Sequence, residues 1–431
     1  MNYCITMRKS PIIKIAKTLL WIIGFLLIVV GGLYPIKNRD VLLVVDIDGE
    51  TESIMVTAEE MQLLHQIKLP YSGSETTGIK EIRFYRHFTS LCISKISMEK
   101  FDEYAYIDGN ELVFNENTLK KMKELSTSVI SERLLYVEVI LAGIILVWIL
   151  LNALDEKINP KNYDNHGPIY EIKRFANDLV KYQEYIIFSA RADLKAEVAN
   201  SYLNRLWWLL EPFFNMLVYV VVFGKVMGRS VENYATFVFS ALLMWNYFSK
   251  TVNYSVKCVR NSRDIVTKIY VPKYVLLLSN MVLNFIKLLF SLLVLVVMLI
   301  VFQVSVGNAV FWVIPAYIVM IVLSFGVGMI FLHYGVYVDD LAYAVGILLQ
   351  MLMFLSGIFY EMITALDAPL NEILLCFNPV AVFIDTMRNA LLNNRVTNVP
   401  LIGVWLILAI LLSYIGIHNV YRNENGYVKV I

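Results

Sequence analysis

The sequence predicts an α-helical polytopic membrane protein with one soluble α+β domain near its N-terminus. Its 431 residues are 58% hydrophobic and only 17% charged, whereas soluble domains are about 45–50% apolar and about 25% charged. The apolar residues gather in long runs with few charges, which are long enough to cross a bilayer as helices. The net charge of +1 gives no indication of a nucleic-acid partner.

The first expected span is a charge-free run, Thr18–Tyr34, that follows a basic start. A secretory signal peptide would have similar features, but no small-x-small cleavage site follows this run. We therefore expect a retained anchor over residues 1–35, with its basic flank in the cytoplasm. Residues 134–154 form a second expected span.

Residues 36–133 differ from the rest because charge is frequent and apolar residues come in short bursts. A domain of about 100 residues can fold alone. It follows a span that starts in the cytoplasm, so we expect it to be extracellular. Alternation and turn signals predict strands over 41–47, 82–87, 91–96, 104–107 and 112–114, and helices over 58–68 and 117–124.

Residues 155–206 form a loop rich in Lys and Arg, which is typical of the cytoplasmic side. Within it, apolar residues recur at helical spacing beside a polar face. This pattern predicts an amphipathic helix on the cytoplasmic surface of the bilayer, and an ordinary linker helix is the alternative. The apolar face holds Ile172, Phe175, Ala176 and Leu179, and the polar face holds Lys173, Arg174, Asp178 and Lys181.

Six further spans are expected within residues 207–421. The segment 364–399 is too broken by Pro369 and Asn378-Pro379 to span, so we expect a re-entrant pair of short helices there. Both termini, including the tail 422–431, are expected in the cytoplasm of a multi-pass protein of the bacterial cell membrane. The six expected spans are 207–226, 234–252, 280–302, 309–333, 341–363 and 401–421.

Enzyme signatures are missing from the sequence. It has no G-x-x-x-x-G-K-[ST], H-E-x-x-H or G-x-S-x-G motif. Asp46-Ile47-Asp48 spells the D-x-D of metal-dependent glycosyltransferases, but a solvated turn is the favoured interpretation. The four cysteines lack metal-ligand spacing. We expect no catalytic residue, no metal and no cofactor bound by this chain.

Five fragments in the second half, taken together and in order, resemble the permease subunits of type-2 ABC exporters. The similarity is greatest to those that move lipid-linked polysaccharides such as teichoic acids, O-antigens and capsules. Residues 1–165 are not covered, and Asn204, Arg205, Asp339 and Gly357 depart from the family pattern. The fragments are Asp193–Pro212, Phe239–Phe248, Asn261–Pro272, Asp339–Tyr360 and Asn378–Arg388.

The resemblance implies a six-span core to which two N-terminal spans and the extracellular domain are added. It also implies a homodimer that docks two copies of a separate ABC ATP-binding subunit, where ATP and magnesium bind, and a lipid-linked glycan as substrate. The residues expected to couple ATP hydrolysis to transport are Lys173, Arg174, Asn261, Arg263, Asp264, Lys268 and Pro272.

The substrate pathway is expected to use aromatic rings, because apolar sugar faces lie well on them. Ordinary packing and interfacial belts are the alternative for each ring. Glu211 lies about one turn into its span, where a carboxylate needs a partner such as Arg205 or has a role in gating substrate access; Lys287 is expected to snorkel. The candidates are Arg205, Trp207, Trp208, Glu211, Phe239, Trp245, Tyr247, Phe359 and Tyr360.

Three other functions stay open at this point. A type-2 ABC exporter of drugs or small lipids would share the same core. A membrane glycosyltransferase would use Asp46 and Asp48, and a sensor would bind its ligand within residues 36–133. The sequence does not identify the glycan.

Overall fold

The structure is a computed structural model, and its described part consists of residues 20, 41–47, 50–57, 60, 66–70, 79–86, 91–96, 101–108, 111–127, 130–158, 167–199, 201–203, 206–226, 233–366 and 370–430. Within these residues, five helices are long and apolar enough to cross a membrane, or six if one bent pair is counted as a span. The expected span at 18–34 lies outside the described residues.

The N-terminal domain, residues 41–127, contains two antiparallel sheets. The first has the strand order β2-β1-β4-β5 and the second has the order β3-β7-β6. Helix α5 contacts β1 and β7. The elements are β1 (Val41–Ile47), β2 (Glu50–Val56), β3 (Ile67–Pro70), β4 (Ile79–Arg86), β5 (Leu91–Ile96), α4 (Phe101–Tyr104), β6 (Ala105–Asp108), β7 (Glu111–Phe114) and α5 (Glu116–Thr127).

Most strands of this domain agree with the sequence prediction, and the differences have physical reasons. The helix expected over 58–68 is wrong at its end, because Ile67 and Leu69 alternate with exposed residues and bury their side chains as β3. Strand β2 was missed because its sequence, ETESIMV, is largely polar. Among the described strands it pairs with β1 alone, at the edge of its sheet.

The remainder of the chain is helical. The helix α6 is followed by two helices outside the bundle, α7 and α8, and then by the bundle itself. The elements are α6 (Ile130–Ile158), α7 (Pro168–Lys181), α8 (Gln183–Val198), α9 (Trp207–Tyr219), η5 (Val220–Val226), α10 (Tyr234–Asn261), α11 (Arg263–Val266), α12 (Lys273–Val301), η6 (Asn308–Trp312), α13 (Val313–Tyr337), α14 (Leu341–Leu355), α15 (Met362–Ala365), α16 (Leu370–Phe377), α17 (Pro379–Leu392) and α18 (Val399–Val430).

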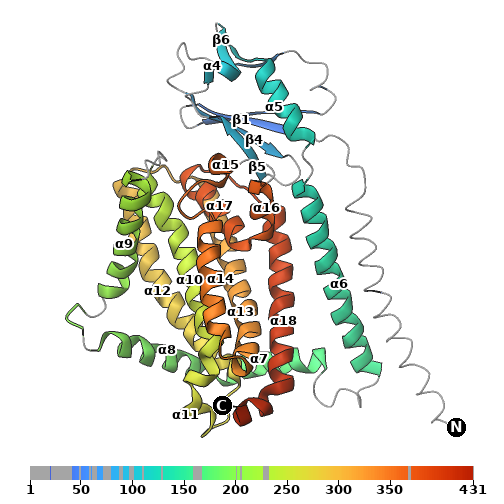
Figure 1. The fold of residues 1–431 in the computed structure, drawn as a ribbon, viewed down its shortest axis with the longest axis vertical. Coiled ribbons are helices and arrows are strands. Elements are labelled where there is room, and N and C mark those ends of the chain that lie inside the picture. Colours follow the sequence, from blue (N-terminus) through green and yellow to red (C-terminus); the bar gives the residue numbers. More distant parts are fainter. Residues whose placement is uncertain are drawn as a thin grey trace, which may run out of the picture.

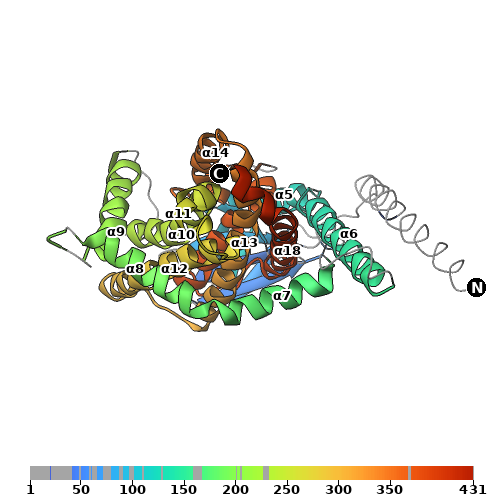
Figure 2. The ribbon, with the colours of Figure 1, turned by 90° about the horizontal axis from the view of Figure 1, so that it is seen from below.

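Figure 1 shows the N-terminal domain above one end of the bundle, next to α15, α16 and α17, while α7, α8 and α11 lie at the opposite end. The first is called the domain end below, and the second the α7–α8 end. Seen from the α7–α8 end, α7 and α8 run along one edge of the bundle and α6 stands beside α18 (Figure 2). Helices α13 and α18 pack together at the centre, and α10 packs on α12 and α13.

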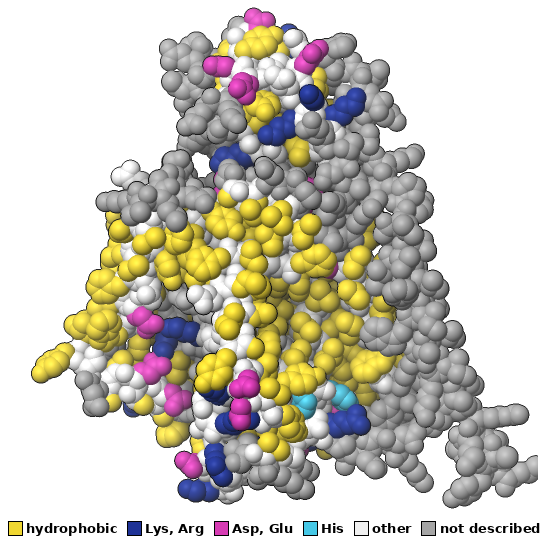
Figure 3. Space-filling model, in the orientation of Figure 1, with side chains coloured by type: hydrophobic (Ala, Val, Ile, Leu, Met, Phe, Trp, Pro, Cys, Tyr) yellow, Lys and Arg dark blue, Asp and Glu magenta, His cyan; other side chains and the backbone are white. Residues whose placement is uncertain are grey.

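Hydrophobic side chains cover the middle of the bundle (Figure 3), whereas charged side chains gather on the domain and toward the α7–α8 end. Exposed apolar side chains in this zone include Leu293, Ile300 and Ile347. Such a zone between two polar ends fits a bilayer.

The expected spans at 234–252 and 341–363 correspond to α10 and α14, which are not among the five helices long and apolar enough to cross a membrane. Other differences lie at helix ends. Helix α12 begins at Lys273 rather than at residue 280, and α10 continues to Asn261. Helix α14 ends at Leu355, well before the expected residue 363. The expected pair of short helices after it is present, since α16 and α17 meet at an angle of 99°.

The early end of α14 is explained by the turn that follows it. Gly357 adopts a φ of +68°, which favours glycine, and a Cβ there would lie 2.9 Å from Met362. Arg388 of α17 donates to the carbonyl oxygens of Gly357 (2.7 Å) and Ile358 (2.6 Å). These carbonyls are therefore satisfied by a side chain instead of by a continuing helix.

Candidate functional site

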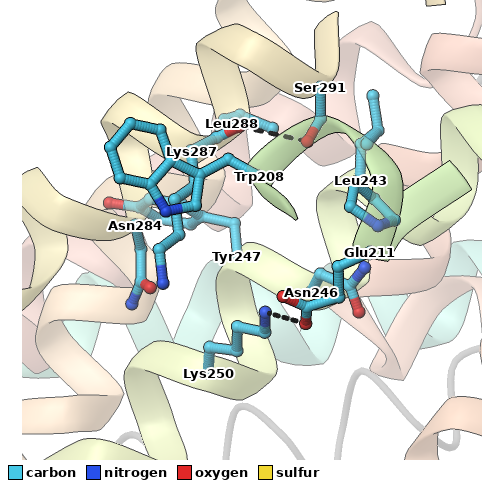
Figure 4. Close-up of a pocket in the computed structure, with 11 residues that line it drawn as sticks. Trp208, Glu211, Leu243, Asn246, Tyr247, Lys250, Asn284, Lys287, Leu288 and Ser291 are labelled. Carbon is cyan, nitrogen blue, oxygen red and sulfur yellow. Dashed lines mark hydrogen bonds and ion pairs between the residues drawn. The ribbon is translucent and has the colours of Figure 1, made fainter. Parts of the chain in front are cut away.

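A pocket lies between α9, α10 and α12, toward the α7–α8 end of the bundle. Its volume is about 470 Å³, including its opening to solvent. Figure 4 shows that charged and amide side chains from all three helices surround it. The lining consists of Trp208, Glu211 and Pro212 of α9, Leu243, Asn246, Tyr247 and Lys250 of α10, and Asn284, Lys287, Leu288 and Ser291 of α12.

Two ion pairs hold the charged side chains of this pocket. Lys250 lies 2.9 Å from Glu211 (Figure 4), and Lys287 lies 2.7 Å from Glu197 of α8. The partner of Glu211 is thus Lys250 from the neighbouring helix; Arg205, the partner considered from the sequence, lies outside the described residues. Lys287 does not merely snorkel, because Glu197 anchors its ammonium group.

One polar group of the pocket lacks a partner within the described part of the chain. The indole N–H of Trp208 is buried, and no acceptor there lies within hydrogen-bond distance of it. A buried donor without an acceptor costs about 1–3 kcal/mol. The pocket therefore combines a spare N–H donor with two ammonium groups whose partners are side chains.

The other aromatic candidates occupy different surroundings. Phe239, Trp245 and Tyr247 are buried in the bundle. Phe359 is buried and stacks on Phe223, with ring centroids 4.4 Å apart, and the hydroxyl of Tyr360 donates to the carbonyl of Phe354. Trp207 is exposed. A role of these rings in a pathway stays a prediction.

A second group of polar side chains ties α7 to the end of α18. Arg174 of α7 donates to Glu424 of α18 (2.8 Å) and to the hydroxyl of Tyr270 (2.6 Å). Tyr274 of α12 donates to Asp178 of α7 (2.6 Å) and accepts from Tyr421 (3.1 Å). Burial and Glu424 raise the pKa of Tyr270 to about 12, so its hydroxyl stays protonated at neutral pH.

This contact corrects part of the predicted faces of α7. Lys173 and Lys181 are exposed as expected and Phe175 packs on the core, but two residues of the expected polar face do not face solvent. Arg174 and Asp178, expected on the outer polar face, point toward the bundle. Ile172 and Val180 are exposed instead, because the outside of this helix can meet lipid rather than water. Although burial lowers the pKa of Arg174, the hydrogen bond and charge of Glu424 outweigh it and raise that pKa above its ordinary value.

The expected coupling residues lie around α11 at the α7–α8 end (Figure 1). Asn261, Arg263, Asp264 and Lys268 are exposed, and so is Lys173 of α7. Pro272 is buried and directly precedes α12. The exposed residues are therefore accessible to a partner, whereas Arg174 is engaged within its own chain.

Sequence reasoning did not single out Lys250, Glu197 and Glu424, which are the ion-pair partners of candidate or neighbouring residues. Nothing in the local sequence distinguishes them from other charged residues near span ends. Their partners are 39, 90 and 250 residues away. The one available signal was Glu211, an acid inside an apolar run that required a cation nearby.

Comparisons with known proteins support the family resemblance. The family described as "ABC-2 type transporter" matches residues 186–392. The chain is 28% identical over 244 residues to the O-antigen export system permease protein RfbA of Myxococcus xanthus, covering 56% of this chain and 92% of that protein. It is 24% identical over 249 residues to RfbA of Klebsiella pneumoniae, covering 58% of this chain and 95% of that protein.

The family match begins within α8 and ends at the last residue of α17. It therefore includes the pocket and α11, and excludes the N-terminal domain, α6 and α7. Within the described residues, no group of His, Cys, Asp and Glu side chains is arranged to hold a metal ion. Through residues 186–392, this chain is therefore similar to the membrane domain of ABC-2 type transporters.

Proposed function

We propose that the chain is the permease of an ABC exporter that carries a lipid-linked polysaccharide across the cytoplasmic membrane. The observation that carries this proposal is its similarity to O-antigen export permeases over 92% and 95% of their lengths. Two permease chains would pair with two copies of an ATP-binding subunit that binds ATP and magnesium. The α7–α8 end would face the cytoplasm, and the N-terminal domain would be extracellular.

The pocket between α9, α10 and α12 is the proposed site of substrate access. If the α7–α8 end faces the cytoplasm as proposed, the pocket would lie near the inner leaflet, where a lipid-linked substrate would start. The ammonium groups of Lys250 and Lys287 and the indole N–H of Trp208 would donate hydrogen bonds to a phosphate or sugar oxygen. Glu211 and Glu197 would hold the two ammonium groups until the substrate replaces them.

The exposed residues of α11 are the proposed contact with the ATP-binding subunit, together with Lys173. Arg174 would act differently, because it joins α7 to Glu424 and Tyr270. A displacement of the loop that carries Tyr270 would therefore reach α7 and α18 directly. In this proposal the short helices α15, α16 and α17 form the exit.

The proposal is tested with proteoliposomes that contain the permease and its ATP-binding subunit. The probe is an oligosaccharide linked to polyprenyl diphosphate, and the readout is ATP-dependent movement of the glycan to the opposite leaflet, detected with a lectin. We expect transport of this probe. Transport of drugs or short-chain lipids without transport of the glycan would overturn the proposal in favour of a small-molecule exporter.

A further inference from the structure

Two cations lie directly opposite each other on the first sheet of the N-terminal domain. Arg83 of β4 pairs in register with Lys95 of β5. Like charges at such positions repel each other and destabilise a sheet. Arg83 is also buried, with 5% of its side chain exposed. Positive charge is therefore concentrated at this position of the sheet.

An anion from the transport core of the same chain lies beside both cations. Glu361, directly before α15, lies 3.2 Å from Lys95 and 3.8 Å from Arg83. The three side chains are only 5–21% exposed. Ion pairs that are shielded in this way are screened less by solvent and salt than surface pairs.

Further polar contacts join β4 to α17 and the residues after it. Arg83 donates to the amide oxygen of Asn389 (3.1 Å), and Arg395 donates to the hydroxyl of Tyr85 (3.3 Å). Asn389 follows Arg388, which binds the carbonyls of Gly357 and Ile358. Arg388 of α17 and Arg83 of the domain thus both contact the segment 357–361. Arg83 also contacts α17 through Asn389.

The side-chain alternation of β4 agrees with contacts on both faces of the sheet. Ile82 and Phe84 are buried in the core of the domain, whereas Arg83 and Tyr85 reach the transport core. Ile96 of β5 and Met362 of α15 belong to one continuous cluster of buried apolar residues, and these two elements are in contact. The interface therefore includes the contact of β5 with α15 as well as the ion pairs.

We propose that the N-terminal domain is a fixed cap on the short helices α15–α17 of its own chain, locked by Glu361 between Arg83 and Lys95. The cap positions residues 357–361, and the domain and these helices move as one body. Calling α15–α17 the exit rests on the proposed function, but the docking of the domain does not. A sensor domain that moved freely on a stalk would not bury charged side chains against the transport core.

The test measures the distance between the domain and the core in the full-length protein in lipid nanodiscs. Spin labels are placed at Lys120→Cys on α5 and Val306→Cys after α12, both exposed positions. Cys4 and Cys92 are replaced by Ser, while Cys258 and Cys376 stay because they are buried. The charge variants are Lys95→Glu, Glu361→Lys and the double exchange.

We expect one narrow distance distribution in the parent protein and a broad one in each single variant, because each single change leaves like charges together. The double exchange restores opposite charges at positions 95 and 361 but leaves a lysine at position 361 beside Arg83, so it should narrow the distribution in part. Lys68→Glu is the matched control, since Lys68 pairs with Glu111 within the domain and both are about half exposed. It should leave the distribution narrow.

A broad distribution in the parent would overturn the proposal, and so would a narrow one in both single variants. A double exchange as broad as the single variants would exclude the ion pair between positions 95 and 361 as the contact that holds the domain, because opposite charges at these two positions would then have had no effect. The measurement needs no transport substrate. Failure of the export assay would therefore refute the proposed function without affecting this result.

Discussion

At the scale of single residues, Arg388 is a buried cation that joins three segments. It donates to the carbonyls of Phe237, Gly357 and Ile358, and its guanidinium lies 3.4 Å from the centroid of the Phe237 ring. The sequence identified Arg388 as the end of the family-like fragment Asn378–Arg388 but did not indicate its partners. Its partners lie 30 residues or more away along the chain.

Arg388→Ala should lower the free energy of unfolding by about 3 kcal/mol, since each buried carbonyl left without a donor costs about 1–3 kcal/mol. Arg388→Lys should recover only part of this loss, because an ammonium group lacks the fork of donors. Thermal unfolding in detergent measures both. Arg422→Ala, at an exposed position of α18, is the control and should unfold like the parent.

Lys250→Ala and Lys287→Ala should each raise the KM for the lipid-linked glycan about tenfold, because a charged hydrogen bond contributes about 1.5–3 kcal/mol. Stability should change little, since both ion pairs are partly exposed. Initial rates in proteoliposomes measure the effect. Lys195→Ala on the exposed side of α8 is the comparison; an equal loss there would argue against a role of the pocket.

At the scale of elements, α11 presents exposed charged side chains at the α7–α8 end. Arg263→Ala combined with Asp264→Ala should abolish export while the protein remains in the membrane, because both side chains are exposed and available for a contact with the ATP-binding subunit. Export and ATP hydrolysis are measured together with membrane content. Unchanged export in this variant would refute the coupling role of α11.

The position of α7 depends on its contact with α18. Glu424→Ala removes the carboxylate that Arg174 and Tyr270 share. Amide hydrogen exchange of residues 168–181 should become roughly tenfold faster, which corresponds to about 1.4 kcal/mol. Glu184→Ala, an exposed position at the start of α8, should leave the exchange of α7 unchanged. If both variants exchange at the parent rate, packing alone holds α7.

At the scale of the whole molecule, the proposed orientation places the N-terminal domain and α8 on opposite sides of the membrane. Lys120→Cys on α5 should react with a membrane-impermeant maleimide in intact cells. Lys195→Cys on α8 should react only after permeabilisation. The reverse pattern would invert the orientation, and with it the proposed direction of transport.

Much of the architecture could be predicted from the sequence because it depends on local patterns. The long apolar run that becomes α18 and the short apolar run that becomes β1 are properties of neighbouring residues. Helix ends were less predictable. The end of α14 depends on Gly357 and on Arg388, which lies in another helix. The edge strand β2 has no apolar alternation of its own and forms by pairing with β1.

The sequence by itself determined the apolar spans, the separate N-terminal domain and the resemblance to ABC-2 type transporters, because hydrophobic runs and family fragments are contiguous in the chain. Only the tertiary structure decided which charges meet. Arg83 with Glu361, Arg174 with Glu424 and Lys250 with Glu211 are pairs between separate elements. Charge pairing depends on distances in space, and no local pattern of residues encodes them.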